Sequence, residues 1–295
     1  MRVGKALVIA GTLIVSLVAA PAATAVFPGE NGRIAFTRAD RIFVMDADGS
    51  NAERLRTNAS EPAWSADGAH IAFSAFRDGG GSDIFMMDAD GSNATALTQF
   101  RPGFNLAPAW APNGRRLVFI HNTREGTDLY VLRLTDGHIR QLTSSPRIVE
   151  RAPEWSPDGE LIVFSRFRET GTPTDEDVFV IDPDGEDITR LTTTRTNDFQ
   201  PSWSPDAAQV IYVRDTSRHG STLFVMDADG GNVTKLTPDD TEEFWPVFSP
   251  DGTRVAFSRC ADFTCDIYTM DPDGSNLTQL TSGDRLESRP DWQAI

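Results

Sequence analysis

The stretch SRPDWQAI, residues 288–295, decides the fold because it is one more copy of a motif that recurs along the whole chain. The other copies read EPAWSADG (61–68), APAWAPNG (107–114), APEWSPDG (152–159), QPSWSPDA (200–207) and WPVFSPDG (245–252). A long segment follows each of these copies, whereas nothing follows residues 288–295. We therefore expect this last copy to complete a structural unit that begins elsewhere in the chain.

The aromatic residue of each copy marks a regular period. These anchors are Trp64, Trp110, Trp155, Trp203, Phe248 and Trp292, at spacings of 46, 45, 48, 45 and 44 residues. Between them lie apolar segments rich in β-branched and aromatic residues, such as HIAFSAF (70–76), which are typical of short strands. A period of this length with four short strands is characteristic of a propeller blade.

Two kinds of turn separate the strands. Ser-Pro-Asp-Gly places proline where φ is near −65° and glycine where φ is positive. Asp-x-Asp-Gly, as in DIFMMDADGSN (83–93), places aspartates where they cap backbone N–H groups. The second motif resembles the start of a calcium loop but lacks the downstream glutamate, so we interpret it as a hairpin turn.

We predict an all-β fold, a six-bladed β-propeller of four-stranded blades. GRIAF (32–36) matches GAHIAF (68–73), so the N-terminal segment enters the repeat just after the point where residues 288–295 leave it. We expect the two ends to share one blade, with residues 288–295 as its innermost strand. Pairing of the N- and C-terminal strands then closes the ring and removes a free sheet edge.

Residues 1–25 read as a secretory signal peptide. Arg2 and Lys5 precede an apolar run, and Ala23-Thr24-Ala25 resembles a cleavage site. The alternative is an uncleaved anchor helix. We expect residues 26–295 to form one exported domain without stable membrane insertion, in the periplasm, in the cell envelope or outside the cell.

The charge argues against a nucleic-acid partner. The chain has 27 basic and 43 acidic residues, a net charge of −16, which repels phosphate backbones. An acidic surface favours cationic ligands, basic protein patches or metal ions, although solubility alone also explains it.

The motifs APEWSPDG (152–159) and DIYTMDPDGSN (266–276) resemble the repeat of the TolB-like, WD40-like β-propellers, and the resemblance covers residues 30–295. It implies the propeller fold strongly and the function weakly. The family includes periplasmic TolB, which binds the lipoprotein Pal, propellers fused to peptidases, and some pectin lyases. This chain lacks the separate α/β domain of TolB, so the resemblance does not imply a full role in a Tol-Pal system.

We do not expect an enzyme or a cofactor. The chain has no Gly-x-Ser-x-Gly or His-Glu-x-x-His motif, and its four histidines, His70, His121, His138 and His219, lie in different repeats. The prediction is a binding module for a protein, peptide or cell-envelope ligand, acting as a monomer. The alternatives are a carbohydrate- or peptide-processing propeller enzyme and a passive structural envelope protein.

Variable loops after the second and fourth strand of each repeat should lie on one face of the ring, here called the loop face, where recognition is expected. Its candidate ligand-binding aromatics are Phe104, Phe167, Phe199, Phe244 and Trp245. The alternative is that each packs beneath its own loop.

An acidic mouth is predicted where the channel opens on the loop face. The residues three positions before the leading prolines include Glu150, Asp198, Glu243 and Glu287, with Asn105 at the equivalent place. We expect them to capture a divalent cation or a Lys or Arg side chain of a partner. The alternative is that each carboxylate caps its own connection or pairs with a nearby arginine, such as Arg147, Arg151, Arg195 or Arg289.

Cys260 and Cys265 are the only cysteines. Because an exported protein meets oxidising conditions, we predict that they form a disulfide that stiffens one loop of this face.

Overall fold

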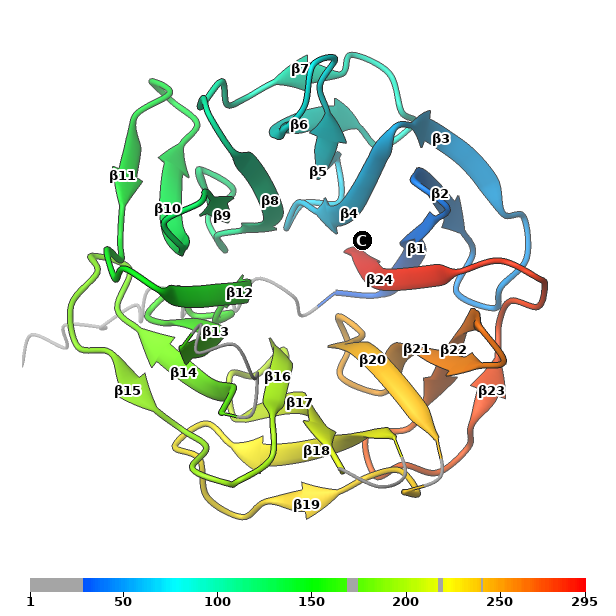
Figure 1. The fold of residues 1–295 in the computed structure, drawn as a ribbon. Helices are drawn as coiled ribbons and strands as arrows, with labels where there is room; N and C mark the ends of the chain where they lie inside the picture. The colour runs from blue at the N-terminus through cyan, green and yellow to red at the C-terminus, as the bar shows by residue number, and fades with distance from the viewer. Residues whose placement is uncertain (1–28, 169–174, 217–219, 240) are drawn as a thin grey trace, which may run out of the picture.

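The computed structural model describes residues 29–168, 175–216, 220–239 and 241–295. The predicted signal peptide and His219 lie outside these residues. Within the described ranges every regular element is a β-strand, and no helix long and apolar enough to cross a bilayer is present. The strands are arranged around a central axis, which is the architecture of an all-β propeller (Figure 1).

The strands form antiparallel groups that follow the sequence repeat. The first group is β24 (Glu287–Ala294), β1 (Asn31–Arg38), β2 (Arg41–Met45) and β3 (Glu53–Thr57). The second is β4 (Ala59–Trp64), β5 (His70–Phe76), β6 (Ser82–Asp88) and β7 (Thr95–Ala96). The third is β8 (Phe104–Trp110), β9 (Arg116–Asn122), β10 (Thr127–Arg133) and β11 (Ile139–Gln141).

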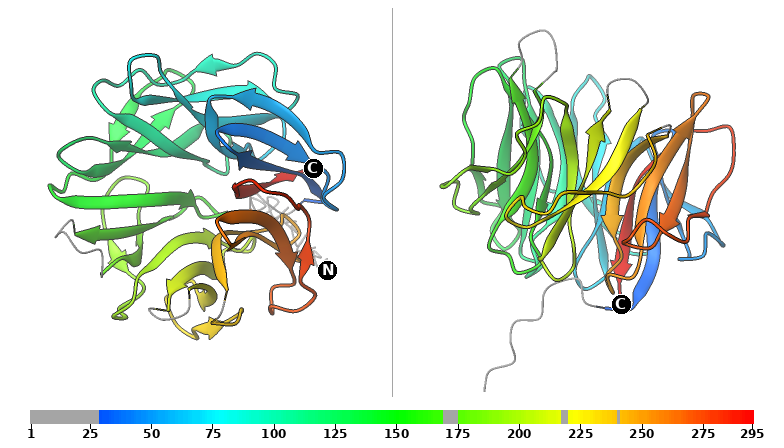
Figure 2. Two further views of the ribbon diagram at one scale, coloured as in Figure 1. Left: turned by 45° about the vertical axis from the view of Figure 1, so that its right-hand side comes forward. Right: turned by 90° about the horizontal axis from the view of Figure 1, so that it is seen from below.

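The remaining strands repeat this order. The fourth group is β12 (Ile148–Trp155), β13 (Ile162–Arg168), β14 (Asp177–Ile181) and β15 (Thr189–Arg190). The fifth is β16 (Asp198–Trp203), β17 (Gln209–Asp215), β18 (Ser221–Asp227) and β19 (Thr234–Lys235). The sixth is β20 (Glu242–Phe248), β21 (Val255–Ala261), β22 (Thr264–Met270) and β23 (Thr278–Gln279). In each group the first strand listed lies innermost, and the strands run between two opposite faces of the molecule (Figures 1 and 2).

The Asp-x-Asp-Gly segments form the hairpin turns that the sequence predicts. In the first of them Asp46 Oδ2 accepts a hydrogen bond of 2.7 Å from Asn51 Nδ2, and Asp48 Oδ1 accepts one of 2.9 Å from the Ser50 N–H. Gly49 has φ +86°, and a Cβ there would lie 2.5 Å from the Leu280 carbonyl oxygen. Glycine is therefore required both by the backbone conformation and by the contact with the neighbouring group.

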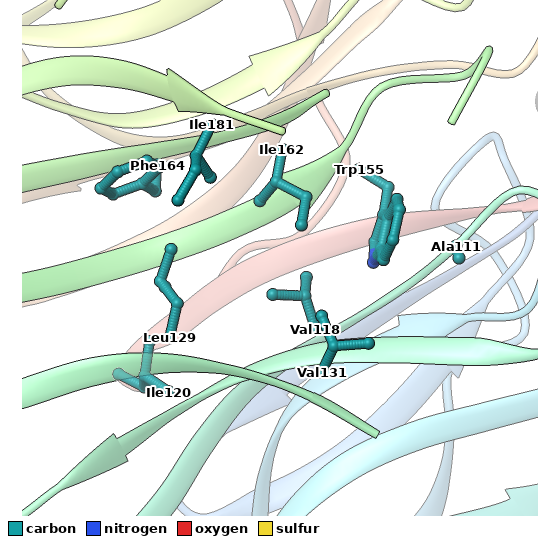
Figure 3. Packing of buried hydrophobic residues seen from close by; sticks show 9 residues of the cluster. All are labelled: Ala111, Val118, Ile120, Leu129, Val131, Trp155, Ile162, Phe164 and Ile181. Atoms are coloured by element: carbon teal, nitrogen blue, oxygen red, sulfur yellow. The ribbon is translucent and has the colours of Figure 1, made fainter. Parts of the chain in front are cut away.

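The hydrophobic core lies between neighbouring groups rather than inside any one of them. Leu129 of the third group belongs to one buried cluster with Trp155 and Phe164 of the fourth, and all three side chains have no exposed surface (Figure 3). Full burial of a large apolar side chain contributes roughly 1.5–3 kcal/mol. Each sheet therefore depends on the sheets beside it for its stability.

The two ends of the described chain meet in one sheet. Strand β24 is antiparallel to β1, with Ile34 opposite Trp292 and Arg38 opposite Glu287. Trp292 is 3% exposed and belongs to the core cluster that contains Ile34 and Phe36. The last residues of the sequence thus cover the inner edge of β1.

Replacing Trp292 with alanine should lower the free energy of unfolding by about 3–5 kcal/mol, because it opens a cavity in this cluster.

Deleting residues 288–295 should cause aggregation or a large fall in melting temperature, because it exposes the edge of β1. Chemical and thermal denaturation measure both effects, and Ile295→Ala, at a position that is 67% exposed, is the matched control. A truncated protein that stays monomeric with an unchanged melting curve contradicts this role of β24.

Candidate functional site

A repeated irregularity shapes the centre of the molecule. The residue before the proline of each innermost strand has a positive φ, which an L-residue adopts only at a cost of roughly 1–2 kcal/mol. These residues are Glu61, Ala107, Ala152, Gln200, Trp245 and Arg289, with φ between 47° and 57°. The ladder to the second strand shifts register at this point in β4, β8, β12, β16 and β20. Because this conformation recurs in all six repeats, it is a feature of the repeat itself.

The innermost strands enclose a central cavity of about 160 Å³. Its walls are mainly prolines, alanines and tryptophans of these strands, and its polar lining includes Glu61, Glu154, Gln200, Arg289 and Asp291. The volume is enough for several water molecules or for a group of side-chain size. We call this space the central channel.

Arg289 occupies one side of the channel and is already partnered. Its Nη1 lies 2.6 Å from Glu61 Oε1, and its guanidinium carbon lies 3.7 Å from the centre of the Trp245 ring. Glu61 also accepts hydrogen bonds from Ser74 Oγ at 2.6 Å and from the Ala107 N–H at 2.7 Å. Burial lowers the pKa of Arg289, and the charge of Glu61 opposes that shift. This side of the channel is a preformed, charge-balanced wall.

Glu154 and Asp291 behave differently, because neither carboxyl has an ion-pair partner within the described part of the chain. Glu154 accepts hydrogen bonds from the Trp203 N–H at 3.0 Å and from Ser202 Oγ at 3.2 Å, and Asp291 accepts one from the Trp64 N–H at 2.6 Å. Burial raises the pKa of Glu154 to about 8 and that of Asp291 to about 7, and the charge of Asp291 adds to the shift at Glu154. Near neutral pH Glu154 is therefore mostly protonated and Asp291 about half protonated, and a nearby cation would favour the ionised form of both.

The sequence contained a signal for these two residues that the repeat alignment did not use. Each is the variable residue of a Pro-x-Trp copy, between a proline and a tryptophan that are buried. Because side chains alternate across a strand, the variable residue lies on the opposite side from its two neighbours, toward the axis. An Asp or Glu at that position of the motif therefore predicts a carboxyl group that lines the central channel.

The predicted acidic mouth is wrong, because its four carboxylates are neither free nor exposed. Each is at most 3% exposed and lies opposite an arginine of the adjoining strand. The pairs are Glu150 with Arg166 at 3.6 Å, Asp198 with Arg214 at 2.6 Å, Glu243 with Arg259 at 2.6 Å, and Glu287 with Arg38. Strand register selects these partners, which are not the nearby arginines considered from the sequence.

These pairs also tie neighbouring groups together. Glu150 Oε2 accepts hydrogen bonds from the Leu129 N–H at 3.2 Å and from the Thr143 hydroxyl, both of which belong to the preceding repeat. Asn105 is fully buried as well, and its amide donates to Asp83 at 3.0 Å while its oxygen lies 2.8 Å from His121 Nδ1. In the described residues no cluster of three or more His, Cys, Asp or Glu side chains could hold a metal ion. The role of these positions is structural.

The predicted loop-face aromatics differ in exposure. Phe167 is 9% exposed beneath Arg151, whose guanidinium carbon lies 4.7 Å from the ring centre, so its prediction as an open contact is wrong. Phe199 and Phe244 are half-buried with ring centres 6.4 Å apart.

Trp245 lines the channel, and Phe104 is 41% exposed. The most exposed aromatic of the described chain, Phe263 at 99%, was not among the predicted residues.

The predicted disulfide is confirmed. Cys260 and Cys265 are bonded and lie opposite each other in the β21–β22 ladder. The bond closes the hairpin that carries Phe263 at its tip.

The fold and the central channel define a β-propeller of the repeat type that the sequence resembles. The model of the PD40 family, the TolB beta propeller domain, matches residues 29–174 and 149–294, so the chain belongs to this family.

Curated relatives are similar over part of their length. The Tol-Pal system protein TolB of Desulfosudis oleivorans is 30% identical over 107 residues, which are 35% of this chain and 24% of that protein. The same protein of Francisella tularensis subsp. mediasiatica is 25% identical over 195 residues, which are 63% of this chain and 43% of that protein. The chain thus spans less than half the length of these relatives.

Solved structures share the fold. TolB from Acinetobacter baumannii superposes with a TM-score of 0.77 at 22% identity, covering 89% of this chain and 66% of that one. Hydrazine synthase of Kuenenia stuttgartiensis superposes with a TM-score of 0.76 at 16% identity, covering 90% and 47%. At these identities the likeness shows the fold alone.

The channel carboxyls should make stability depend on pH. Glu154 and Asp291 hold protons in the folded state that the unfolded chain releases above about pH 4.5, so stability should fall as pH rises from there through about 8. We expect the double variant Glu154→Gln, Asp291→Asn to remove most of the decline between pH 5 and pH 8, a difference of several kcal/mol at about 1.4 kcal/mol for each unit of pKa shift, measured by urea denaturation. Glu160→Gln, at an exposed position, is the control. A double variant with the wild-type slope refutes the assignment.

Proposed function

We propose that the chain is an exported, non-enzymatic propeller that binds a protein or peptide ligand through its loop face and central channel. Its family membership supports this, since the curated relatives are named as Tol-Pal system proteins. The pattern of residues 1–25 supports export. The cavity lining offers carboxyl, amide and guanidinium groups but, among the described residues, no histidine or cysteine to act as base or nucleophile.

The proposal includes the closed form of the scaffold. The strand groups described above are the blades of a six-bladed ring, and the pairing of β24 with β1 joins its two ends. A closed ring fixes the channel walls, so that the walls are preorganised before the ligand arrives. Preorganisation reduces the entropy lost on binding.

The observation that carries the proposal is the state of Glu154 and Asp291. Both line a preformed cavity without an ion-pair partner and have raised pKa values, while Arg289 of the same lining is already neutralised by Glu61. A Lys or Arg side chain of a ligand fits this arrangement, because its alkyl stem packs against the proline and tryptophan walls while its charge ionises the carboxyls. The channel then selects a basic residue at the tip of a peptide or loop.

The test begins with affinity capture from the native cell envelope on immobilised mature protein. In parallel, capture is done on the double variant Glu154→Gln, Asp291→Asn, and on Asp239→Asn, at an exposed loop position, as control. We expect the double variant to bind the captured ligand at least tenfold more weakly. Calorimetry of that ligand in two buffers of different ionisation enthalpy should show proton release on binding to the wild type.

Equal capture by the wild type and the double variant refutes the channel site. Turnover of a captured peptide or saccharide by the purified protein refutes the non-enzymatic assignment.

A further inference from the structure

The hairpin tip of β21 and β22 carries an unusual turn. Ala261 pairs with Thr264, so Asp262 and Phe263 form a two-residue turn, with φ of 48° and 67°. Hairpins in which both turn residues have positive φ strongly favour Asn-Gly or Asp-Gly, because glycine has no Cβ to clash with the backbone. Phenylalanine at the second position costs stability, since a bulky residue is an outlier in this region.

Burial of the Phe263 side chain does not offset the unfavourable free energy of this turn. Phe263 is 99% exposed, more than any other large hydrophobic residue of the described chain. Directly beneath it the disulfide joins Cys260 to Cys265, and Thr264 Oγ1 donates a hydrogen bond of 2.9 Å to the Ala261 carbonyl. The only two cysteines of the protein therefore brace a turn whose least favourable residue points into solvent.

A second exposed apolar side chain lies beside the hairpin. Leu286, which is 56% exposed, forms a parallel bridge with Cys265, whose N–H donates to the Arg285 carbonyl at 3.4 Å. Phe263 and Leu286 thus come from segments that lie next to each other at the loop face. Exposed apolar side chains are ordinary on a protein surface, so it is the unfavourable turn holding Phe263 in solvent that points to an interaction site.

The charges around this pair decide the kind of partner. Asp262 adjoins Phe263, Asp284 lies two residues before Leu286, and Glu242 pairs with Cys260, and all three carboxylates are exposed. Among the residues that the structure describes, Arg285 is the exposed basic residue beside them. This surplus of acidic groups repels anionic lipid and complements basic side chains.

We propose that Phe263, supported by Leu286, is a docking residue that inserts into an apolar pocket of a protein partner, with basic side chains of the partner around the pocket. A rigid exposed aromatic that loses little entropy on binding is typical of an interface anchor. The inference deepens the proposed function, because the hairpin lies on the loop face, but it uses none of the channel residues.

The experiment selects a displayed library of random peptides on the immobilised mature protein, on Phe263→Gly and on Phe263→Ala. We expect the wild type to enrich peptides that combine aromatic or aliphatic residues with Lys or Arg, and both variants to bind them at least tenfold more weakly. Phe263→Gly should at the same time raise the melting temperature by a few degrees, because glycine suits the turn. Higher stability with lost binding excludes misfolding as the cause.

Further variants separate this inference from the channel proposal. Peptides anchored by Phe263 should bind the double variant Glu154→Gln, Asp291→Asn as tightly as the wild type, whereas channel ligands should not. Cys260→Ser, Cys265→Ser should weaken the Phe263-dependent peptides by about three- to tenfold, because the hairpin loses its brace.

Two results overturn the inference. One is a selection in which no enriched peptide depends on Phe263. The other is Phe263-dependent flotation with vesicles of phosphatidylcholine and phosphatidylglycerol, which assigns the residue to a lipid surface instead.

Discussion

Each group of strands buries its apolar side chains against the groups beside it and has no separate core of its own. Trp155, for example, is buried by residues of the preceding sheet, and Trp292 by the first and sixth sheets. Sheets with this constraint are stable only when stacked between neighbours, and stacking around an axis leaves the innermost strands lining a common centre. The position and shape of the channel therefore follow from the way in which the core is buried.

The same constraint explains why so many charged groups near the axis are structural. Where a carboxylate of an innermost strand is buried against its own sheet, as Glu243 is, strand register supplies an arginine to neutralise it. A buried charge without a partner would cost several kcal/mol. Glu154 and Asp291 do not follow this pattern, since they lie toward the cavity and are stabilised by neighbouring backbone N–H groups and by their bound protons. Burial also raises the pKa of Glu150 to about 7, so the two sets differ in their partners and in their position at the cavity rather than in pKa alone.

The sequence alone predicts the features of the structure that follow a repeated pattern. It does not predict features that depend on the surroundings of a single side chain. The period of the Pro-x-Trp anchors predicts an all-β propeller, and the expected oxidising surroundings of an exported protein predict the disulfide of its two cysteines, Cys260 and Cys265. The acidic mouth failed because the partner of Glu150 is set by register with β13, and Arg166 is not adjacent in the sequence. Phe263 was missed because its importance lies in a positive φ and full exposure, which composition does not show. The position of Glu154 and Asp291 near the axis can be predicted from the alternation of side chains along a strand. Their raised pKa values cannot, because they depend on packing by residues of several repeats.

We infer that the central channel holds two carboxyl groups with raised pKa values, which a bound cation would ionise. Carbon-13 NMR of the side-chain carboxyl carbons, recorded as a function of pH and assigned with Glu154→Gln and Asp291→Asn, measures this directly. We expect titration midpoints of about 8 for Glu154 and about 7 for Asp291. Midpoints near 4, the ordinary value for exposed carboxyls, would contradict it.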